Sequence, residues 1–227
     1  MILEGDTQWI KRPGQFVNIE LEGLYLRRPI SICDWDDKTI TIIYKVVGKG
    51  TEQMSQMQPG VELDVLTGLG NGFNPEPAVE NTKSLLVGGG VGVPPLYHLA
   101  KVLLAAGRKV SVVLGFNTAA EVFYAEEFRA LGADVYVSTA DGSMGVKGFV
   151  TDAIREAAID FDYFYSCGPL PMLKALCGCT DKPGELSFEE RMGCGFGACM
   201  GCSCKTLTGN KRICKEGPVM RREEIIW

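Results

Sequence analysis

Three things are scarce in this sequence of 227 residues: histidine, long apolar runs and clusters of basic residues. His98 is the only histidine, and no combination of histidine, aspartate and serine suggests nucleophilic catalysis, so we expect the chemistry to belong to cofactors. No apolar stretch approaches the roughly 20 residues that cross a bilayer, and residues 1–13 lack the apolar core of a signal peptide. The net charge of −5, without a Lys/Arg run, argues against nucleic acid as a partner. We therefore expect a cytoplasmic protein with no membrane partner.

Cysteine, by contrast, is plentiful. The chain has nine cysteines, although stable disulfides are rare in the cytoplasm, so the thiols need another explanation. Five of them fall within residues 194–214, which is typical of a metal site. The others are scattered, and buried small hydrophobic residues are the simplest interpretation of Cys33, Cys177 and Cys179.

The spacing of the crowded cysteines predicts an iron–sulfur cluster. Cys194, Cys199, Cys202 and Cys214 are separated by four, two and eleven residues, with glycines among the first three. The C-x4-C-x2-C core is the plant-type [2Fe–2S] spacing. Zinc remains an alternative, but only Cys199 and Cys202 form a typical zinc knuckle. Cys204 is a spare thiol, and we favour Cys214 as the fourth ligand because Cys202 and Cys204 are too close in sequence to share a cluster without strain.

The rest of the chain falls into two zones. Residues 1–77 contain short β-rich runs without helices, which predicts a small antiparallel barrel or sandwich with strands at Gln15–Leu21, Pro29–Asp34, Thr39–Val46 and Val61–Leu66. Residues 78–178 alternate buried strands with helical segments, which predicts an α/β domain with a parallel sheet. Residues 179–227 are rich in glycine and cysteine and are expected to be loops that carry the cluster.

Two places in the α/β zone suit a dinucleotide. Gly88, Gly89, Gly90 and Gly92 follow a strand and open a helix, where the backbone can approach a pyrophosphate. The spacing is not the strict G-x-G-x-x-G, so a tight turn without a ligand is the alternative. Cys167, followed by Gly168 and Pro169, ends the last strand at the edge where such sheets bind ligands. We expect Cys167 to border a nicotinamide ring, with a core thiol as the alternative.

The β-rich zone contains weaker signals for a second cofactor. Arg28, in Arg28-Pro29-Ile30-Ser31, can bind a phosphate through its guanidinium group, and Ser31 can hydrogen-bond to a ring edge. This tetrapeptide is common, so an ordinary strand is equally compatible with it. Residues 48–51, which include Gly50 and Thr51, can form a small nest of backbone donors or a plain turn. His98 is interpreted as a solvated or helix-capping residue.

Taken together, these motifs resemble the ferredoxin–NADP reductase superfamily. Within it, the sequence is similar to the electron-transfer subunits of two-subunit, NAD-dependent dihydroorotate dehydrogenases, an enzyme of pyrimidine biosynthesis. The similarity is carried from end to end by PGQFVNI, RRPISI, IYKVVGKGT, LLVGGGVGVPPLYHLA, YSCGPLPML, ERMGCGFGACMGCSCKT and ICKEGPVM. One departure is at the N-terminus: only 12 residues precede Pro13, and Met1–Trp9 is a poor strand, so the barrel is expected to lack or borrow its first strand.

The resemblance implies cofactors, ligands and a partner. It implies FAD bound by residues of the β-rich zone, namely Arg28, Pro29, Ile30, Ser31, Ile43, Tyr44, Lys45, Gly50 and Thr51. It implies a [2Fe–2S] cluster on Cys194, Cys199, Cys202 and Cys214. The implied partner is an FMN-containing catalytic subunit, in a heterotetramer of two chains each.

The implied path of electrons runs from dihydroorotate to FMN in the partner, then through the cluster and FAD to NAD+. NAD is favoured over NADP because Phe116–Ala119, after the second strand of the α/β zone, contains no arginine for a 2′-phosphate. The flavin and iron–sulfur subunit of a sulfide dehydrogenase or a bifurcating transhydrogenase is an alternative, because it would carry the same motifs. A zinc-stabilised interaction module is the alternative without enzymatic activity.

Overall fold

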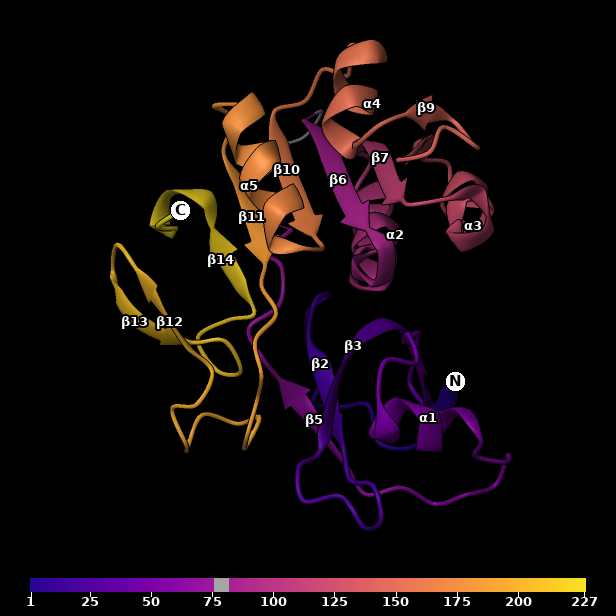
Figure 1. The fold of residues 1–227 in the computed structure, drawn as a ribbon, viewed down its shortest axis with the longest axis vertical. Helices are drawn as coiled ribbons and strands as arrows, with labels where there is room; N and C mark the ends of the chain where they lie inside the picture. Colours follow the sequence, from indigo (N-terminus) through magenta and orange to yellow (C-terminus); the bar gives the residue numbers. More distant parts are fainter. Residues whose placement is uncertain (76–81) are drawn as a thin grey trace.

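The structure is a computed structural model that describes residues 1–75 and 82–227, and the elements named below belong to these residues. Figure 1 shows an antiparallel sheet at one end of the molecule, a larger mostly parallel sheet at the other, and a hairpin segment at their side. No helix of the described residues is long and apolar enough to cross a membrane.

The antiparallel sheet has the strand order β1-β4-β3-β2-β5. Its strands are β1 (Ile2–Glu4), β2 (Phe16–Ile19), β3 (Arg28–Trp35), β4 (Thr39–Ile42) and β5 (Val65–Leu69). The N-terminal residues form a strand, contrary to the expectation for Met1–Trp9, because Ile2–Glu4 pairs with Thr39–Thr41 of β4. In the described residues β1 and β5 form the two edges of the sheet and do not pair with each other, so the sheet is a half-barrel.

Two features of this sheet differ from the pattern in the sequence. The edge strand β5 begins at Val65 rather than Val61, since it pairs with β2 only from there onward. Helix α1 (Lys49–Ser55) begins inside the expected turn. The hydroxyl of Thr51 starts this helix by accepting the backbone N–H groups of Val47 at 2.9 Å and Gly48 at 3.2 Å. The sequence did not indicate this helix, because the glycines on either side of Lys49 have a low helix propensity.

The parallel sheet has the order β14-β11-β10-β6-β7-β8-β9, in which only β14 runs antiparallel to its neighbour. Its strands are β6 (Lys83–Gly89), β7 (Lys109–Phe116), β8 (Asp134–Thr139), β9 (Val146–Lys147), β10 (Tyr163–Cys167), β11 (Gly184–Ser187) and β14 (Val219–Arg221). Because β11 and β14 come from residues 179–227, the sheet continues across the predicted boundary at 178/179. The other predicted boundary, at 77/78, lies outside the described residues.

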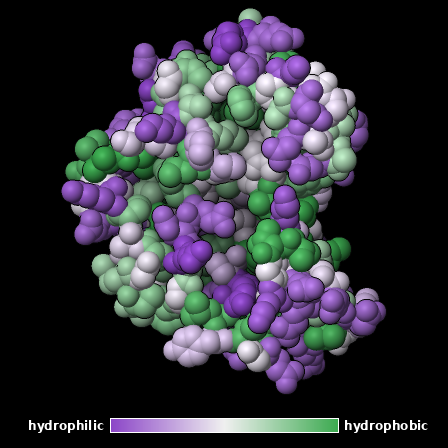
Figure 2. Space-filling view, viewed as in Figure 1, coloured by the Kyte–Doolittle hydropathy of each residue, from purple (hydrophilic) through white to green (hydrophobic). Residues whose placement is uncertain are grey.

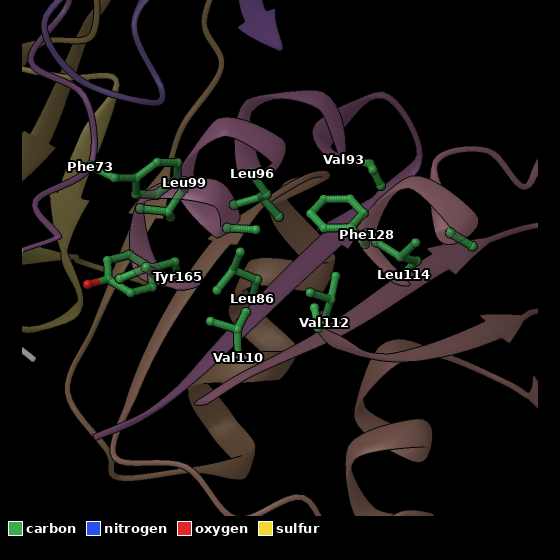
Figure 3. Packing of buried hydrophobic residues seen from close by; sticks show 14 of the residues in the cluster. Phe73, Leu86, Val93, Leu96, Leu99, Val110, Val112, Leu114, Phe128 and Tyr165 are labelled. Atoms are coloured by element: carbon green, nitrogen blue, oxygen red, sulfur yellow. The ribbon is translucent and has the colours of Figure 1, made fainter. Parts of the chain in front are cut away.

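Helices cover both faces of this sheet. They are α2 (Tyr97–Ala105), α3 (Ala125–Ala130), α4 (Val150–Glu156) and α5 (Leu170–Cys179), with the 3₁₀ helices η1 (Gly90–Gly92), η2 (Pro94–Leu96), η3 (Ala119–Glu121) and η4 (Arg222–Glu224). On one face Leu86 and Val112 pack against α2 and α3, together with Tyr165 and Phe73 (Figure 3). On the other face Leu85 and Val113 pack against residues of α4 and α5. The alternating strands and helices predicted for this zone are therefore confirmed.

An ion-pair cluster joins the two sheets. Asp34 of β3 accepts hydrogen bonds from Nδ1 of His98 at 2.6 Å and from Nζ of Lys101 at 2.9 Å, and both donors belong to α2. The His98 ring also stacks on Trp35, with ring centroids 3.6 Å apart. The interpretation of His98 as a solvated or capping residue is therefore wrong. The histidine was misassigned because its partners lie about 64 positions earlier in the chain, which a local pattern does not show.

The C-terminal segment lies against the antiparallel sheet. Its hairpin strands β12 (Ser203–Thr206) and β13 (Gly209–Arg212) pair with each other, and the loop before them carries three of the crowded cysteines. Phe16 of β2 packs with Cys202, Ile213, Cys214 and Met220. This contact explains why all four residues of β2 are buried, since its other face, with Val17 and Ile19, packs inside the half-barrel.

Candidate functional site

The glycine turn after β6 is shaped mainly by close packing. A Cβ on Gly92 would lie 2.3 Å from the carbonyl oxygen of Cys167, and one on Gly89 would lie 2.6 Å from Sδ of Met172. Gly88 is likewise crowded, by Val93. Gly90 differs, since it has a φ of +52° and open space where its Cβ would be. The turn thus places Gly90, the first residue of the 3₁₀ helix η1, where a ligand can approach the backbone.

The same packing brings the ends of β6 and β10 together. Gly168 and Pro169 both lie against Gly89, so the two predicted dinucleotide segments form one edge. Cys167 is the last residue of β10 and pairs with Ser187, the last residue of β11. The carboxyl ends of β6, β10 and β11 point toward the antiparallel sheet (Figure 1). A ligand at this edge would therefore face residues of β3 and its neighbours.

The Cys167 thiol is held in its neutral form. Burial of the thiol raises the pKa of Cys167 to about 12, and a hydrogen bond with Ser187 offsets only part of that effect. Because the thiolate is the nucleophilic form, Cys167 is suited to contact a ring rather than to attack it. Ser187 was missed from the sequence, since it lies in a four-residue strand without an apolar pattern.

The residues predicted to bind FAD surround the start of β3. A Cβ on Gly50 would lie 2.1 Å from Nε of Arg28, so the guanidinium group packs directly on the first turn of α1. Arg28 also donates to the carbonyl oxygen of Leu26. Pro29, Ile30 and Ser31 follow along the strand, while Ile43, Tyr44 and Lys45 leave the end of the neighbouring strand β4. The Arg28 guanidinium group thus lies beside Gly50 at the start of a helix. Together these groups form a set of donors that suits phosphate oxygens.

The four cysteines of the predicted cluster lie in two pairs. The backbone N–H of Cys199 donates to Sγ of Cys194 at 3.4 Å, and the N–H of Cys214 donates to Sγ of Cys202 at 3.4 Å. Within residues 1–75 and 82–227, no three His, Cys, Asp or Glu side chains converge where a single ion could bind. Two pairs of thiols suit two irons, since each iron of a [2Fe–2S] cluster takes two of the four thiolates.

Backbone donors make this loop a favourable place for thiolates. Burial opposes ionisation of Cys194, but the N–H groups of Cys199, Phe196 and Ala198 outweigh it and lower the pKa of Cys194 to about 6. The N–H of Ala198 is 3.2 Å from this sulfur. Cys202 and Cys214 are buried, whereas Cys199 is exposed. A cluster held here would therefore have a buried side at Cys202 and Cys214 and an exposed side at Cys199.

The remaining thiols are not part of this arrangement. Cys33 is buried, and its burial raises its pKa to about 11. Cys177 is buried in the core between α5 and the sheet, whereas the interpretation of Cys179 as a buried residue is wrong, because it is exposed at the end of α5. Cys204 is partly buried beside the cluster segment, where burial raises its pKa.

An acidic residue lies beyond β7, where a nucleotide ribose would be expected. Glu121 accepts hydrogen bonds from the backbone N–H of Asn117 at 3.2 Å and from its Nδ2 at 2.9 Å. A carboxylate near the second strand of a dinucleotide-binding sheet favours a ribose hydroxyl and disfavours a 2′-phosphate. The preference for NAD was predicted only from the lack of an arginine for a 2′-phosphate. Glu121, four positions after Asn117, was missed.

Two family models match the chain. Residues 189–226 match the family described as the iron–sulfur cluster binding domain of dihydroorotate dehydrogenase B, and residues 86–178 match the oxidoreductase NAD-binding domain. These two ranges contain the paired cysteines and the glycine turn, respectively.

Curated relatives are similar over nearly the full length. The electron transfer subunit of dihydroorotate dehydrogenase B (NAD(+)) from Geobacillus kaustophilus is 50% identical, covering 97% of this chain and 89% of its own. The subunit of the same name from Shouchella clausii is 46% identical, covering 100% of this chain and 91% of its own.

Solved structures share the fold. The structure of an NADH-dependent reduced ferredoxin–NADP oxidoreductase, described in connection with flavin-based electron bifurcation, matches with a TM-score of 0.85 and 35% identity, covering 96% of this chain and 80% of that one. A ferredoxin reductase of carbazole 1,9a-dioxygenase matches with a TM-score of 0.64 and 24% identity, covering 78% and 58%, which shows the fold alone.

Proposed function

Because this chain belongs to the family of electron transfer subunits of dihydroorotate dehydrogenase B (NAD(+)), we propose that it passes electrons from a catalytic subunit to NAD+. It is an oxidoreductase subunit that uses FAD, a [2Fe–2S] cluster and NAD. The alternative of a bifurcating transhydrogenase subunit is less well supported, since the structure of that kind is 35% identical whereas the curated relatives reach 50%.

One arrangement carries this proposal: the paired cysteines lie against the strand that neighbours the predicted flavin residues. Phe16 of β2 packs with Cys202 and Cys214, and it pairs directly with Ser31 of β3. Residues directly opposite in antiparallel strands lie on one face, about 5 Å apart at Cβ. The cysteines therefore pack against β2, and the predicted flavin residues lie on the strand next to it.

Each group of residues has a separate role in this proposal. Arg28 and the first turn of α1, with Gly50 and Thr51, bind the FAD phosphates, while Pro29, Ile30 and Ser31 of β3, with Ile43, Tyr44 and Lys45 after β4, contact the rest of FAD. Cys194 and Cys199 hold one iron, and Cys202 and Cys214 hold the other. Flavin converts between one-electron and two-electron transfer, which is what a path between a cluster and a nicotinamide requires.

At the edge formed by the ends of β6 and β10, the chain binds and orients NAD. Gly90 offers its backbone to the pyrophosphate, and the close-packed Gly88, Gly89 and Gly92 hold the turn against β10. Gly168 and Pro169 shape the floor beside Cys167, whose neutral thiol borders the nicotinamide without reacting with it. Glu121 beyond β7 takes the ribose hydroxyl, so NADH is the expected cofactor. Hydride transfer needs the reacting atoms about 3–3.5 Å apart, so NAD at this edge must lie directly against the flavin.

The catalytic partner is proposed to contain FMN and to assemble with this chain as two copies of each. The relatives' name, electron transfer subunit, implies a catalytic partner. Phe196 and Met200, both 54% exposed, flank Cys199 on the outer side of the cluster loop, and large apolar side chains are enriched at interfaces. Figure 2 shows hydrophilic side chains over much of one face, with hydrophobic side chains in separate groups between them.

The proposal is tested with the reconstituted complex. The chain is purified with its catalytic partner, and NADH formation is followed after dihydroorotate is added. Dihydroorotate-dependent NADH formation by the complex, and only NADH-dependent dye reduction by this chain alone, is the expected result. A complex that reduces NAD+ with sulfide or reduced ferredoxin, and not with dihydroorotate, would contradict the assignment.

A further inference from the structure

A buried asparagine connects the half-barrel to the cluster loop. Asn18 of β2 is 1% exposed, and its Nδ2 donates to the carbonyl oxygen of Cys194 at 3.2 Å. The approach is close, since a Cβ on Gly195 would lie 2.3 Å from this Nδ2. Gly195 also has a φ of +79°, a conformation that favours glycine. The loop thus approaches Asn18 at Gly195, where any side chain would collide with the carboxamide.

The position of Asn18 in the sheet places it next to the predicted flavin residues. It pairs with Pro29 of β3 on one side and with Leu66 of β5 on the other. Asn18 and Phe16 share the outer face of β2, and their partners Pro29 and Ser31 are on the same face. The Asn18 carboxamide therefore connects the backbone of Cys194, a predicted cluster ligand, to β2. The neighbouring strand β3 carries predicted flavin residues.

Packing alone does not explain a carboxamide here. Oδ1 of Asn18 is buried and has no hydrogen-bond partner among the described residues. An acceptor left unsatisfied in the interior is unfavourable, so a leucine would be the more stable choice if the site only needed filling. The carboxamide provides instead the hydrogen bond to the carbonyl oxygen of Cys194, which a leucine could not make.

We propose that Asn18 is the positioning residue for electron transfer between cluster and flavin. It holds the Cys194 loop against β2 and so sets the separation of the two redox sites. This inference rests on the proposed function and adds to it a residue that acts on neither NADH binding nor cluster ligation. Because it acts through the backbone carbonyl of Cys194, its loss should change the rate of transfer more than the cluster itself.

The experiment uses the complete, cofactor-loaded complex, reduced with NADH in an anaerobic stopped-flow instrument. Flavin and cluster absorbance separate the first step, NADH to flavin, from the second, flavin to cluster. Asn18→Leu is expected to leave the first step within about twofold and to slow the second by about tenfold to a hundredfold, because small misplacements of reacting centres have effects of that size. Asn210→Leu, at an exposed position of β13 in the C-terminal segment, is the control and should change neither step.

A second readout does not depend on turnover. Amide hydrogen exchange of residues 193–201 is expected to rise in Asn18→Leu, while the electron paramagnetic resonance spectrum of the reduced cluster stays that of the unmodified protein. Gly195→Ala should slow the same second step, because its Cβ displaces the loop from Asn18. Flavin-to-cluster transfer within about twofold of the unmodified protein in Asn18→Leu would overturn the proposal.

If Asn18→Leu loses iron, Asn18→Gln decides whether the lost hydrogen bond or the changed shape is the cause, because glutamine keeps the carboxamide. Full iron content in Asn18→Gln, with faster cluster reduction than in Asn18→Leu, supports a role for the N–H donor. Equal loss of iron in both variants overturns it, since shape alone would then matter. If the unmodified complex shows neither step with NADH, the proposed function fails, which is a different result from a defect confined to Asn18.

Discussion

The nucleotide-binding sheet and the cluster segment are held together by different forces. Both faces of the sheet bury Leu, Val and Phe side chains against helices, and Leu86, Val87 and Val112 have no exposed surface. Residues 193–201 contain instead four glycines and sulfur atoms that accept backbone N–H groups. The sheet can therefore fold by apolar burial, whereas the cluster loop depends on what its thiolates bind.

The largest expected effect comes from breaking the cluster. Cys202→Ser should abolish flavin-to-cluster transfer and remove iron, and amide exchange in residues 193–214 should rise by about a hundredfold or more while β6 and β7 stay protected. Metal analysis and exchange mass spectrometry measure both. Cys204→Ser is the matched control, because it removes a thiol of the same segment that is outside the proposed ligand set. Full iron in Cys202→Ser, or loss of iron in Cys204→Ser, would contradict the ligand assignment.

A smaller effect is expected where the sheet meets its ligand. Gly92→Ala places a methyl group 2.3 Å from the Cys167 carbonyl oxygen, so the free energy of unfolding should fall by about 1–3 kcal/mol. The KM for NADH should rise as well, because the glycine turn shifts. Gly178→Ala, where nothing lies within 4 Å of the added Cβ, should change stability by less than about 1 kcal/mol. Denaturant titration and steady-state kinetics make the comparison, and equal stability of the two variants would refute the packing argument.

These two regions also differ in how far the sequence predicted them. The alternation of buried strands and helical segments over residues 78–178 and the glycine turn between strand and helix indicated the parallel sheet, because such patterns are local. Strands β11 and β14 were missed, since they are short and gain their partners from distant residues. The cysteine spacing predicted a ligand set, but the contact of Asn18 with Cys194 joins residues 176 positions apart. A polar residue in FVNI was the only hint of it.

The smallest expected effect concerns the contact between the two sheets that Asp34 makes with His98 and Lys101. Burial opposes ionisation of Asp34, but hydrogen bonds from His98 and Lys101 outweigh it and hold the pKa of Asp34 below its usual range. A carboxylate with a lowered pKa stabilises the fold above its ordinary pKa of about 3.9 and loses that contribution as the pH falls through the lowered value. Asp34→Asn should therefore be less stable by about 1–2 kcal/mol at pH 7, with the difference shrinking below about pH 4.

Asp37→Asn, at an exposed position in the turn after β3, is the control for the Asp34 variant. Thermal unfolding of both variants from pH 3 to pH 8 gives the comparison. A pH-independent difference between Asp34→Asn and the unmodified protein would mean that the carboxylate does not act through its charge.

The central claim is that the paired cysteines hold a [2Fe–2S] cluster close enough to a bound flavin to exchange electrons with it. Electron paramagnetic resonance of the anaerobic, NADH-reduced complex tests it most directly. The account predicts the signal of a reduced [2Fe–2S] cluster at about one spin per chain, appearing after the flavin is reduced. Iron-free protein, or a cluster that stays oxidised while NADH fully reduces the flavin, would contradict it.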